Sequence, residues 1–252
     1  MIKISGHQLD DDQFVAQFAT AVAQIAQHEQ VVVVNGGGKS IKALQEALGL
    51  QEAKIDGLRV TDAESLTITE MVMSAQINKL VVRALLAAGL DAIGLSGEDG
   101  RLLLAQKKHS AKGDLGFVGE IMGVRTDLLL SLLALGLTVV ISPVSCDAAG
   151  QHYNVNADEA ATAVAQALTA DRKSTVSNVP GVLYDLNDPE PIAALTPEAV
   201  EALKLEGVIS GGMIPKVASA LEALEKGVQQ VRIVDLAGLE NGGTIFKLES
   251  AG

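Results

Sequence analysis

The sequence has almost no aromatic residues. It contains no tryptophan, and phenylalanine, tyrosine and tryptophan together make up 2% of its 252 residues. Hydrophobic residues still account for 48%, so the core must be built from valine, isoleucine, leucine and alanine. Such aliphatic cores are common in α/β proteins with buried parallel strands. The length allows a substantial core, in one large domain or in two lobes.

The sequence also lacks an excess of positive charge and a second cysteine. The formal net charge is −12, which argues against nucleic acid and against an anionic membrane as the main partner, because both require a basic surface. The single cysteine, Cys146, excludes an internal disulfide, and nothing in the neighbouring sequence marks it as a nucleophile.

No apolar run is long enough to span a membrane. The longest, LLLSLLALGLTVVISPV at 128–144, falls short of the roughly 20 residues that a span requires, and Gly136 divides it into a helix and a strand. The first residues, MIKISGHQLDDDQF, contain no apolar segment of a secretory signal. These absences predict a cytoplasmic protein that does not bind membranes.

Short β-branched runs alternate with longer helical patterns. Strands are predicted at 2–4, 31–34, 91–95, 137–142 and 231–235, and helices at 10–30, 40–48, 61–88, 156–169 and 215–226. Thr61 and Glu64 are expected to cap the helix at 61–88, and Gly89 to end it. The alternation predicts a three-layer α/β/α sandwich with a central, mainly parallel sheet. Residues 101–124 and 181–194 are expected to form hairpins or loops outside it.

Glycine clusters follow several predicted strands. The stretch VVVVNGGGKS at 31–40 resembles a phosphate-binding loop, but Val33 occupies the first glycine position of a P-loop. It also fails the dinucleotide pattern, whose third glycine would fall at Ile41. Three glycines between a buried strand and a helix still expose backbone N–H groups that can bind an anion. The alternative is a tight turn without a ligand.

A series of short motifs resembles one known family over nearly the whole chain. In chain order the motifs are IKISG, NGGGK, GLRVTD, LSGEDG, LGFVGE, YNVNADEAA, NVPGVL and SGGMIPK. Together they resemble the amino acid kinase family, most closely its members that phosphorylate N-acetyl-L-glutamate. The resemblance implies a carbamate kinase-like fold and transfer of the γ-phosphoryl group of ATP to the side-chain carboxylate of N-acetyl-L-glutamate. The product, N-acetylglutamyl 5-phosphate, would belong to arginine biosynthesis.

The resemblance implies three catalytic residues. Lys3 and Lys216 match the two lysines that act on the transferring phosphoryl group and on the leaving side, and Asp158 matches the aspartate that orients them. Positioning and electrostatics carry such reactions. Taken singly, Lys3 could be a surface charge, and Asp158 could be a favourable acidic residue in a first helical turn.

The resemblance also implies four residues that bind the acyl acceptor. Gly37 and Gly38 would cradle the acyl acceptor, Arg59 would bind its α-carboxylate through a planar two-pronged donor, and Asn154 would bind its acetamido end. The alternatives are a surface ion pair of Arg59 with a neighbouring aspartate, and an ordinary turn at Asn154.

The resemblance further implies that ATP binds to glycine-rich turns, most of them in the second half of the chain and one near its start. The residues expected to bind ATP are Gly6, Asn178, Val179, Pro180, Gly181, Val182, Leu183, Val208, Ile209, Ser210, Gly211 and Gly212. Mg²⁺ would arrive with ATP, without a metal site of the protein's own. The four histidines, His7, His28, His109 and His152, have no metal-ligand spacing and are interpreted as ordinary polar residues.

The chain is interpreted as a single amino acid kinase domain, 1–252, with two lobes. Residues 1–172 would bind the acceptor and dimerise, and residues 173–252 would bind ATP. The sequence begins almost at its first strand, without the extra N-terminal helix of arginine-inhibited hexameric members. The resemblance therefore implies a homodimer that arginine does not inhibit.

One apolar stripe could serve that dimer or the core. Leu66, Met73, Ile77 and Leu80 lie along one face of the predicted helix 61–88. The stripe is expected either at the dimer interface or against the sheet of the same chain.

Several positions depart from the family pattern. Asn35 replaces a histidine, Ser5 replaces a glycine, and Lys39 adds a positive charge after the glycines. In DRKSTVSNVPGVL, polar residues at 173–175 stand where the family has a hydrophobic strand, and Asn178 replaces an aspartate. This strand is expected to be weaker or more exposed than its counterparts.

Two other functions remain open from the sequence. The first is a carrier-protein-linked aminoadipate or glutamate kinase of lysine biosynthesis, although the charge of −12 would repel an acidic carrier. The second is a metabolite-binding regulatory homologue without turnover, which the departures at Ser5, Asn35 and Asn178 would favour.

Overall fold

The computed structural model describes residues 1–252 except 7, 51–52, 56–57, 186 and 249–252, and only the backbone of 54, 58 and 59. The strands are β1 Ile2–Ile4, β2 Val32–Asn35, β3 Lys54–Ile55, β4 Leu58–Arg59, β5 Ala92–Ser96, β6 Leu103–Lys107, β7 Val118–Val124, β8 Thr138–Ser142, β9 Val144–Cys146, β10 His152–Val155, β11 Arg172–Val176, β12 Ala194–Leu195, β13 Gln230–Val234 and β14 Thr244–Phe246. The helices are α1 Asp12–Ala26, α2 Gly38–Ala47, α3 Ala63–Glu70, α4 Asn78–Ala87, α5 Thr126–Ala134, α6 Ala157–Ala167, α7 Pro197–Leu205 and α8 Met213–Glu225.

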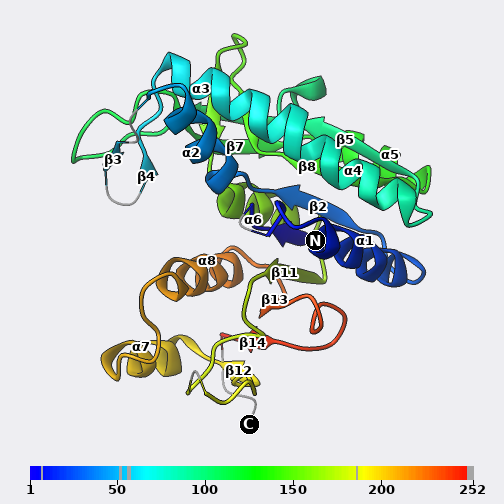
Figure 1. The fold of residues 1–252 in the computed structure, drawn as a ribbon, viewed down its shortest axis with the longest axis vertical. Helices are drawn as coiled ribbons and strands as arrows, with labels where there is room; N and C mark the ends of the chain where they lie inside the picture. The colour runs from blue at the N-terminus through cyan, green and yellow to red at the C-terminus, as the bar shows by residue number, and fades with distance from the viewer. Residues whose placement is uncertain (7, 51–52, 56–57, 186, 249–252) are drawn as a thin grey trace.

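Within the described residues, eight strands form one continuous sheet in the order β12-β14-β13-β11-β1-β2-β8-β5. All neighbouring pairs are parallel except β13 and β14. The prediction of a mainly parallel sheet is therefore confirmed. Strands β6, β7, β9 and β10 close a small barrel outside it, and β3 pairs with β4. Figure 1 shows the chain from β11 onward in the lower part of the molecule and most of the preceding elements above it.

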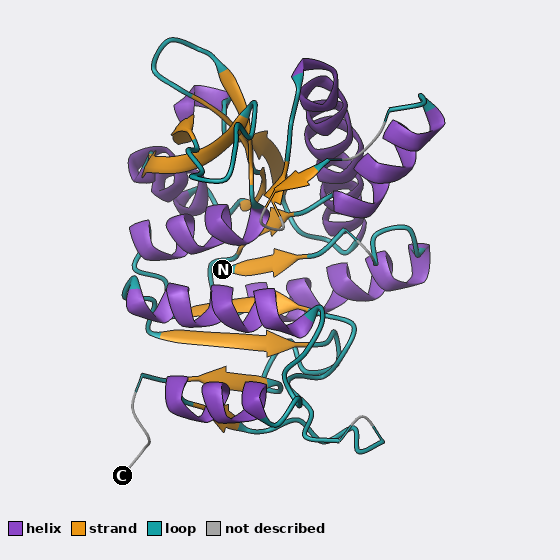
Figure 2. Ribbon diagram, turned by 90° about the vertical axis from the view of Figure 1, so that its left-hand side faces the viewer, coloured by secondary structure: helices purple, strands orange, loops and turns teal. Residues whose placement is uncertain are grey.

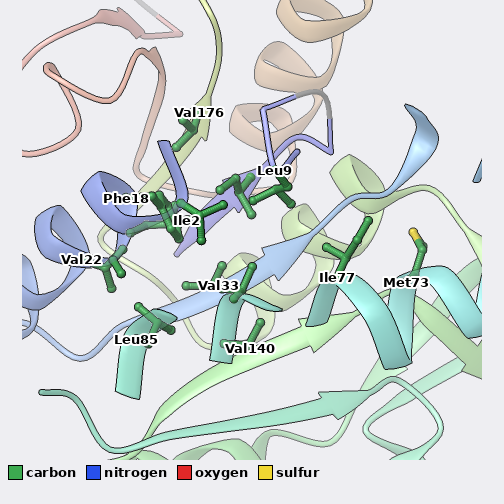
Figure 3. Close-up of a cluster of buried hydrophobic side chains, with 14 of the residues drawn as sticks. Ile2, Leu9, Phe18, Val22, Val33, Met73, Ile77, Leu85, Val140 and Val176 are labelled. Atoms are coloured by element: carbon green, nitrogen blue, oxygen red, sulfur yellow. The ribbon is translucent and has the colours of Figure 1, made fainter. Parts of the chain in front are cut away.

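Helices cover both faces of the sheet, which gives the three predicted layers. Side chains along a strand alternate between faces, so Val33 lies in one core cluster and Val34 in another. Helices α1 and α4 pack with Val33 on the first face, and Figure 3 shows Phe18 and Leu85 there. Helices α5 and α6 cover the second face beside Val34, and a third cluster packs α7 and α8 against β13 and β14. Figure 2 shows these helices flanking the stacked strands.

The long predicted helix at 61–88 begins later and changes its winding. Asp62 is the N-cap, and its side chain accepts a hydrogen bond from the Ser65 amide at 2.8 Å. The predicted cap Thr61 is instead fully buried, and its amide donates to the Leu115 carbonyl at 3.0 Å. Between α3 and α4, residues Met71–Ile77 form a π-helical segment. The capping prediction was wrong because a tertiary partner takes Thr61 out of the helix.

The apolar stripe on this helix belongs to the core of its own chain. Met73 and Ile77 are buried in the α1–α4 cluster, Leu80 packs against it, and Leu66 is 1% exposed. The core interpretation is therefore correct, and the stripe cannot form a dimer interface while it is buried here.

The strand at 172–176 also differs from expectation. Strand β11 pairs with β1 on one side and β13 on the other, so it lies inside the sheet. Lys173, Ser174 and Thr175 are buried despite their polar side chains. The expectation of a more exposed strand was wrong, because neighbouring polar groups satisfy these side chains: Arg232, for example, donates to the Ser174 hydroxyl at 3.1 Å. Among the described residues, no helix combines the length and apolar character needed to cross a membrane.

Candidate active site

The site lies where three central parallel strands end. Strand β1 pairs with β11 and with β2, so the residues that follow these strands meet at one edge of the sheet. They are Ser5 and Gly6 after β1, Gly36–Gly38 after β2, and Ser177 and Asn178 after β11. Ligands of open α/β sheets bind at this edge. The N-terminal turns of α6 and α8 supply Asp158 and Lys216, and β1 supplies Lys3.

Lys3 and Asp158 form an ion pair across this edge. The Nζ atom of Lys3 lies 3.0 Å from Oδ2 of Asp158 and donates to Oγ of Ser5 at 3.0 Å. Lys3 is only 7% exposed, so the pair is far less screened than a surface pair. The serine that departs from the family pattern therefore contributes a hydrogen-bond acceptor to Lys3.

Asp158 is held in place by the start of α6. Asn156 caps this helix, and its side chain accepts hydrogen bonds from the amides of Asp158 at 2.7 Å and Glu159 at 3.3 Å. The positive end of the helix dipole favours the carboxylate there. Oδ1 of Asp158 is buried without a hydrogen-bond partner in the described part of the chain. One oxygen therefore pairs with Lys3, and the other can accept a further bond.

Lys216 reaches the same cluster from the first turns of α8. Its Nζ atom donates a hydrogen bond of 2.7 Å to Oγ of Ser177. Burial and then the charge of Lys3 lower the pKa of Lys216, while Asp158 opposes the shift. The structure therefore brings the three predicted catalytic residues into one electrostatic neighbourhood. Ser177 was not predicted, although its position between β11 and Asn178 placed it at the expected edge.

The glycine loop after β2 packs tightly against β1 and the π-helical segment. A Cβ atom on Gly6 would lie 2.8 Å from the Gly37 Cα, and a Cβ on Gly37 would lie 2.8 Å from the Met73 Cγ. Asn35 donates to the Met73 carbonyl at 3.1 Å and accepts from the Asn78 amide group at 3.1 Å. The asparagine that replaces the family's histidine thus fixes the π-helical segment beside the loop. Such segments are frequent at functional sites.

Gly38 begins helix α2, and within the described part of the chain nothing beyond its neighbours and its own helix lies within 4 Å of the position that a Cβ would take. Lys39, the unusual positive charge after the glycines, is more than half exposed and pairs with Asp10 at 2.7 Å. Its charge is therefore directed to the surface.

The acceptor motifs meet near the barrel. The side-chain amide of Asn154 donates to the Thr61 hydroxyl at 3.0 Å. The backbone N–H of Asn154 donates to the Phe117 carbonyl at 2.8 Å. The Phe117 amide in turn donates to the Thr61 carbonyl at 2.7 Å. The motifs GLRVTD, LGFVGE and YNVNAD are thus joined. Arg59 lies in β4, and its side chain is outside the described part of the structure.

The residues predicted to bind ATP divide into two short segments. Val182 and Ile209 are buried in one cluster with Val217 of α8, so the two segments lie together. The buried side chains of Val182 and Ile209 leave mainly backbone groups for a ligand. Gly212 caps α8, and apart from chain neighbours no described atom lies within 4 Å of a Cβ placed on Gly211 or Gly212. An anion could therefore approach this helix N-terminus.

A groove of about 730 Å³ opens beside α1 and the ends of β11 and β13. Asn178 lines it together with Ser177 and Asp235. The other described residues predicted to bind ATP do not line this groove. Asn178 therefore borders the α1 side of the sheet edge, while its neighbour Ser177 also contacts Lys216 of α8.

His152 lies between two glutamates. Its Nδ1 is 3.1 Å from Oε2 of Glu70 and 3.6 Å from Oε1 of Glu98. The three ligand atoms lie close enough together to hold a metal ion, and an imidazolium ion would satisfy the same carboxylates. Burial and the charge of Glu70 raise the pKa of Glu98. The sequence did not indicate this cluster, because its members come from three separate elements.

The profile of the amino acid kinase family matches residues 1–235. An acetylglutamate kinase of Chloroflexus aurantiacus is 51% identical over 247 residues, which cover 98% of this chain and 95% of that protein. The solved structure of smu.665 from Streptococcus mutans UA159 has a TM-score of 0.82 at 28% identity and covers 98% of both chains. Giardia carbamate kinase, at 15% identity, shares the fold with a TM-score of 0.70 over 97% of this chain and 96% of that chain. The chain therefore belongs to the amino acid kinase family.

Proposed function

We propose that this protein is an acetylglutamate kinase of arginine biosynthesis. It transfers the γ-phosphoryl group of ATP, accompanied by Mg²⁺, to the side-chain carboxylate of N-acetyl-L-glutamate, and the product is N-acetylglutamyl 5-phosphate. The family and the 51% identical relative identify the chain as a kinase with a small-molecule substrate. The observation that carries the proposal within the structure is the cluster of Lys3, Asp158 and Lys216 at the ends of the central strands.

The cluster fits the electrostatics of the reaction. A carboxylate must approach a phosphate that carries several negative charges, and like charges repel strongly in a water-poor site. Two ammonium groups against one carboxylate leave the cluster with a positive charge that offsets this repulsion. Lys3 would act on the transferring phosphoryl group and Lys216 on the leaving side, while Asp158 orients both. Such preorganised charges are a large source of catalysis.

The acceptor would bind between the glycine loop and the barrel. The backbone N–H groups of Gly37 and Gly38 suit the reacting carboxylate, because they lie between the end of β2 and the start of α2. Arg59 and Asn154 would bind the α-carboxylate and the acetamido group. The contact of Asn154 with Thr61, two residues after Arg59, supports this assignment.

ATP would bind across the C-terminal segment. The residues at 178–183 and 208–212, with Gly6, would contact the nucleotide mainly through backbone groups, and the N-terminus of α8 would face its phosphates. In this proposal residues 1–172 form the acceptor lobe and residues 173–252 the nucleotide lobe. A homodimer in the cytoplasm completes the proposal.

The test is to trap the acyl phosphate with hydroxylamine. The enzyme is incubated with ATP, Mg²⁺ and N-acetyl-L-glutamate, in parallel with glutamate and with carrier-linked aminoadipate. Hydroxamate from N-acetyl-L-glutamate alone supports the proposal. Product from the carrier-linked substrate would instead indicate a kinase of lysine biosynthesis, and binding without product would indicate a regulatory homologue.

Arg59→Ala tests the acceptor site in the same assay. We expect the KM for N-acetyl-L-glutamate to rise by about tenfold or more while the KM for ATP changes little, because a bidentate carboxylate contact is lost. An unchanged acceptor KM would rule out the role of Arg59.

A further inference from the structure

Lys173 is a third lysine near the candidate site, and it is fully buried. It lies in β11, and none of its surface is exposed. Lysine is almost never fully buried without a partner, because its ammonium group loses its hydration. Burial lowers the pKa of Lys173 to about 8. The residue therefore remains largely cationic at neutral pH. A hydrophobic side chain could be buried at this position with a smaller free-energy penalty.

The strand register directs Lys173 to the catalytic face of the sheet. Lys3 of β1 pairs with Thr175 of β11, and Lys173 is two residues earlier on the same strand. Paired residues of parallel strands and residues two apart share a face, so the three side chains lie on one side of the sheet. This side is the one that α6 and α8 cover, since the Nζ atom of Lys173 donates to Oγ of Ser219 in α8 at 3.3 Å.

In the part of the structure that is described, Lys173 has unused hydrogen-bond donors, and Asp158 has an unused acceptor oxygen. An ammonium group has three N–H donors, and the bond to Ser219 is the one that the described residues provide for Lys173. Oδ1 of Asp158 is buried without a partner among the same residues. Of the charges that act on the pKa of Lys173, Asp158 has the largest effect and Lys3 the next, followed by Glu222 of α8 and Lys226 at its C-cap. The buried ammonium and the free carboxylate oxygen therefore belong to one cluster.

We propose that Lys173 is a positioning residue of the phosphoryl-transfer site, which shares the Asp158 carboxylate with Lys3. This inference rests on the proposed function. With two ammonium groups attracting the carboxylate, Asp158 holds Lys3 less tightly, and Lys3 can contact the transferring phosphoryl group. Lys173 also adds a positive charge to the side of the sheet on which ATP and the acceptor must approach each other.

The effect should appear in turnover and not in affinity. Lys173 lies inside the sheet layer and does not reach the substrates, so its loss should lower kcat and leave both KM values nearly unchanged. The effect should also depend on pH. Because the pKa of Lys173 is about 8, the wild-type protein itself loses this charge above that pH.

The test compares three variants in the hydroxamate assay between about pH 6.5 and pH 9.5. Lys173→Met keeps the length of the side chain and removes its charge. Ser219→Ala removes the hydrogen bond of Lys173 and keeps its charge. Lys226→Met removes an exposed charge from the end of α8. If Lys173→Met does not fold, Lys173→Gln takes its place with the same expected result.

We expect Lys173→Met to lower kcat by about tenfold or more at pH 7, with both KM values within about threefold of wild type. The ratio of wild-type to variant kcat should shrink as the pH rises past about 8, where the wild type becomes neutral at this position. Ser219→Ala and Lys226→Met should stay close to wild type. Thermal unfolding at pH 7 should show Lys173→Met to be at least as stable as wild type, because a buried charge has been removed.

Three results would overturn the inference. They are a kcat of Lys173→Met within about twofold of wild type, a kcat ratio that does not change with pH, or an equal loss of kcat in Ser219→Ala. The last result would assign Lys173 a purely structural role. If the wild-type protein forms no acyl phosphate at all, the proposed function fails, whereas product from wild type with an unaffected Lys173→Met defeats this inference alone.

Discussion

Nζ of Lys3, in the first strand, lies 3.0 Å from Oδ2 of Asp158, in the first turn of α6. The pair joins the centre of the sheet to the helix that covers it, at the edge where the glycine loops meet. It is mostly buried, so its geometry is maintained by packing and by the Asn156 cap. Removing either partner would leave the other charge buried and unpaired, so changes at this point should affect stability as well as catalysis.

Asp158→Asn should lower kcat by about a hundredfold, because the neutral amide can no longer orient Lys3 and Lys216 by charge. The matched control is Glu159→Gln, one residue further along the same helical turn, whose carboxylate pairs with Lys108 instead. Steady-state kinetics of both variants should show the loss for Asp158→Asn alone. Equal kinetics in the two variants would mean that Asp158 only stabilises the N-terminus of α6 and does not orient the lysines.

Lys3→Ala and Lys216→Ala should each lower turnover by orders of magnitude, with modest changes in substrate affinity, because their charges act mainly on the transition state. Lys39→Ala is the control, since Lys39 follows the glycine loop but forms an exposed pair with Asp10. Isothermal titration with a non-hydrolysable ATP analogue separates binding from chemistry. Loss of nucleotide binding in Lys3→Ala would contradict its assignment to the transferring group.

Gly37→Ala should destabilise the protein by about 1–3 kcal/mol, because the new Cβ would lie 2.8 Å from the Met73 side chain and would displace the π-helical segment. Gly38→Ala, one residue later, has open space and lies in the first turn of α2, so it should be neutral or stabilising by about 0.5–1 kcal/mol. Urea unfolding of the pair measures both effects. Similar free energies of unfolding for the two variants would show that the loop adapts without cost.

Glu98→Gln should stabilise the protein at pH 7, by up to about 1 kcal/mol, because it removes a carboxylate that burial and Glu70 make unfavourable. The sign follows from the raised pKa of Glu98 in the folded state. The destabilisation by ionised Glu98 is complete above that pKa and decreases as the pH falls through it. It vanishes below the pKa of Glu98 in the unfolded state.

Thermal unfolding of Glu98→Gln and wild type between pH 7 and about pH 4 should therefore show a shrinking difference. Glu46→Gln is the control, because Glu46 is an exposed partner of Lys42. Destabilisation by Glu98→Gln at pH 7 would instead show that the contact with His152 dominates.

Several features followed from local sequence because they depend on short-range physics. Gly89 was predicted to end a helix, and it has a positive φ angle. The predicted β-branched runs became strands of the main sheet, and Gly136 divided the longest apolar run. Helix α7 was not predicted, although Thr196 as N-cap and Pro197 after it are typical start signals.

Other features depended on partners that are distant in the chain. Thr61 left the helix for a contact with the Leu115 segment, and the polar strand β11 became central because Arg232 satisfies Ser174. The contact of Lys216 with Ser177 likewise requires α8 to lie over the end of β11. None of these pairings leaves a periodic signal in the sequence.

The sequence by itself determined the alternation of strands and helices, the glycine turns and the residue types of the site, because propensity and burial periodicity act over a few neighbouring residues. Only the tertiary structure decided which of these residues meet. The sheet order places β11, β1 and β2 side by side, and this non-local pairing brings Lys3, Asp158 and Lys216 together and buries Lys173 on the same face.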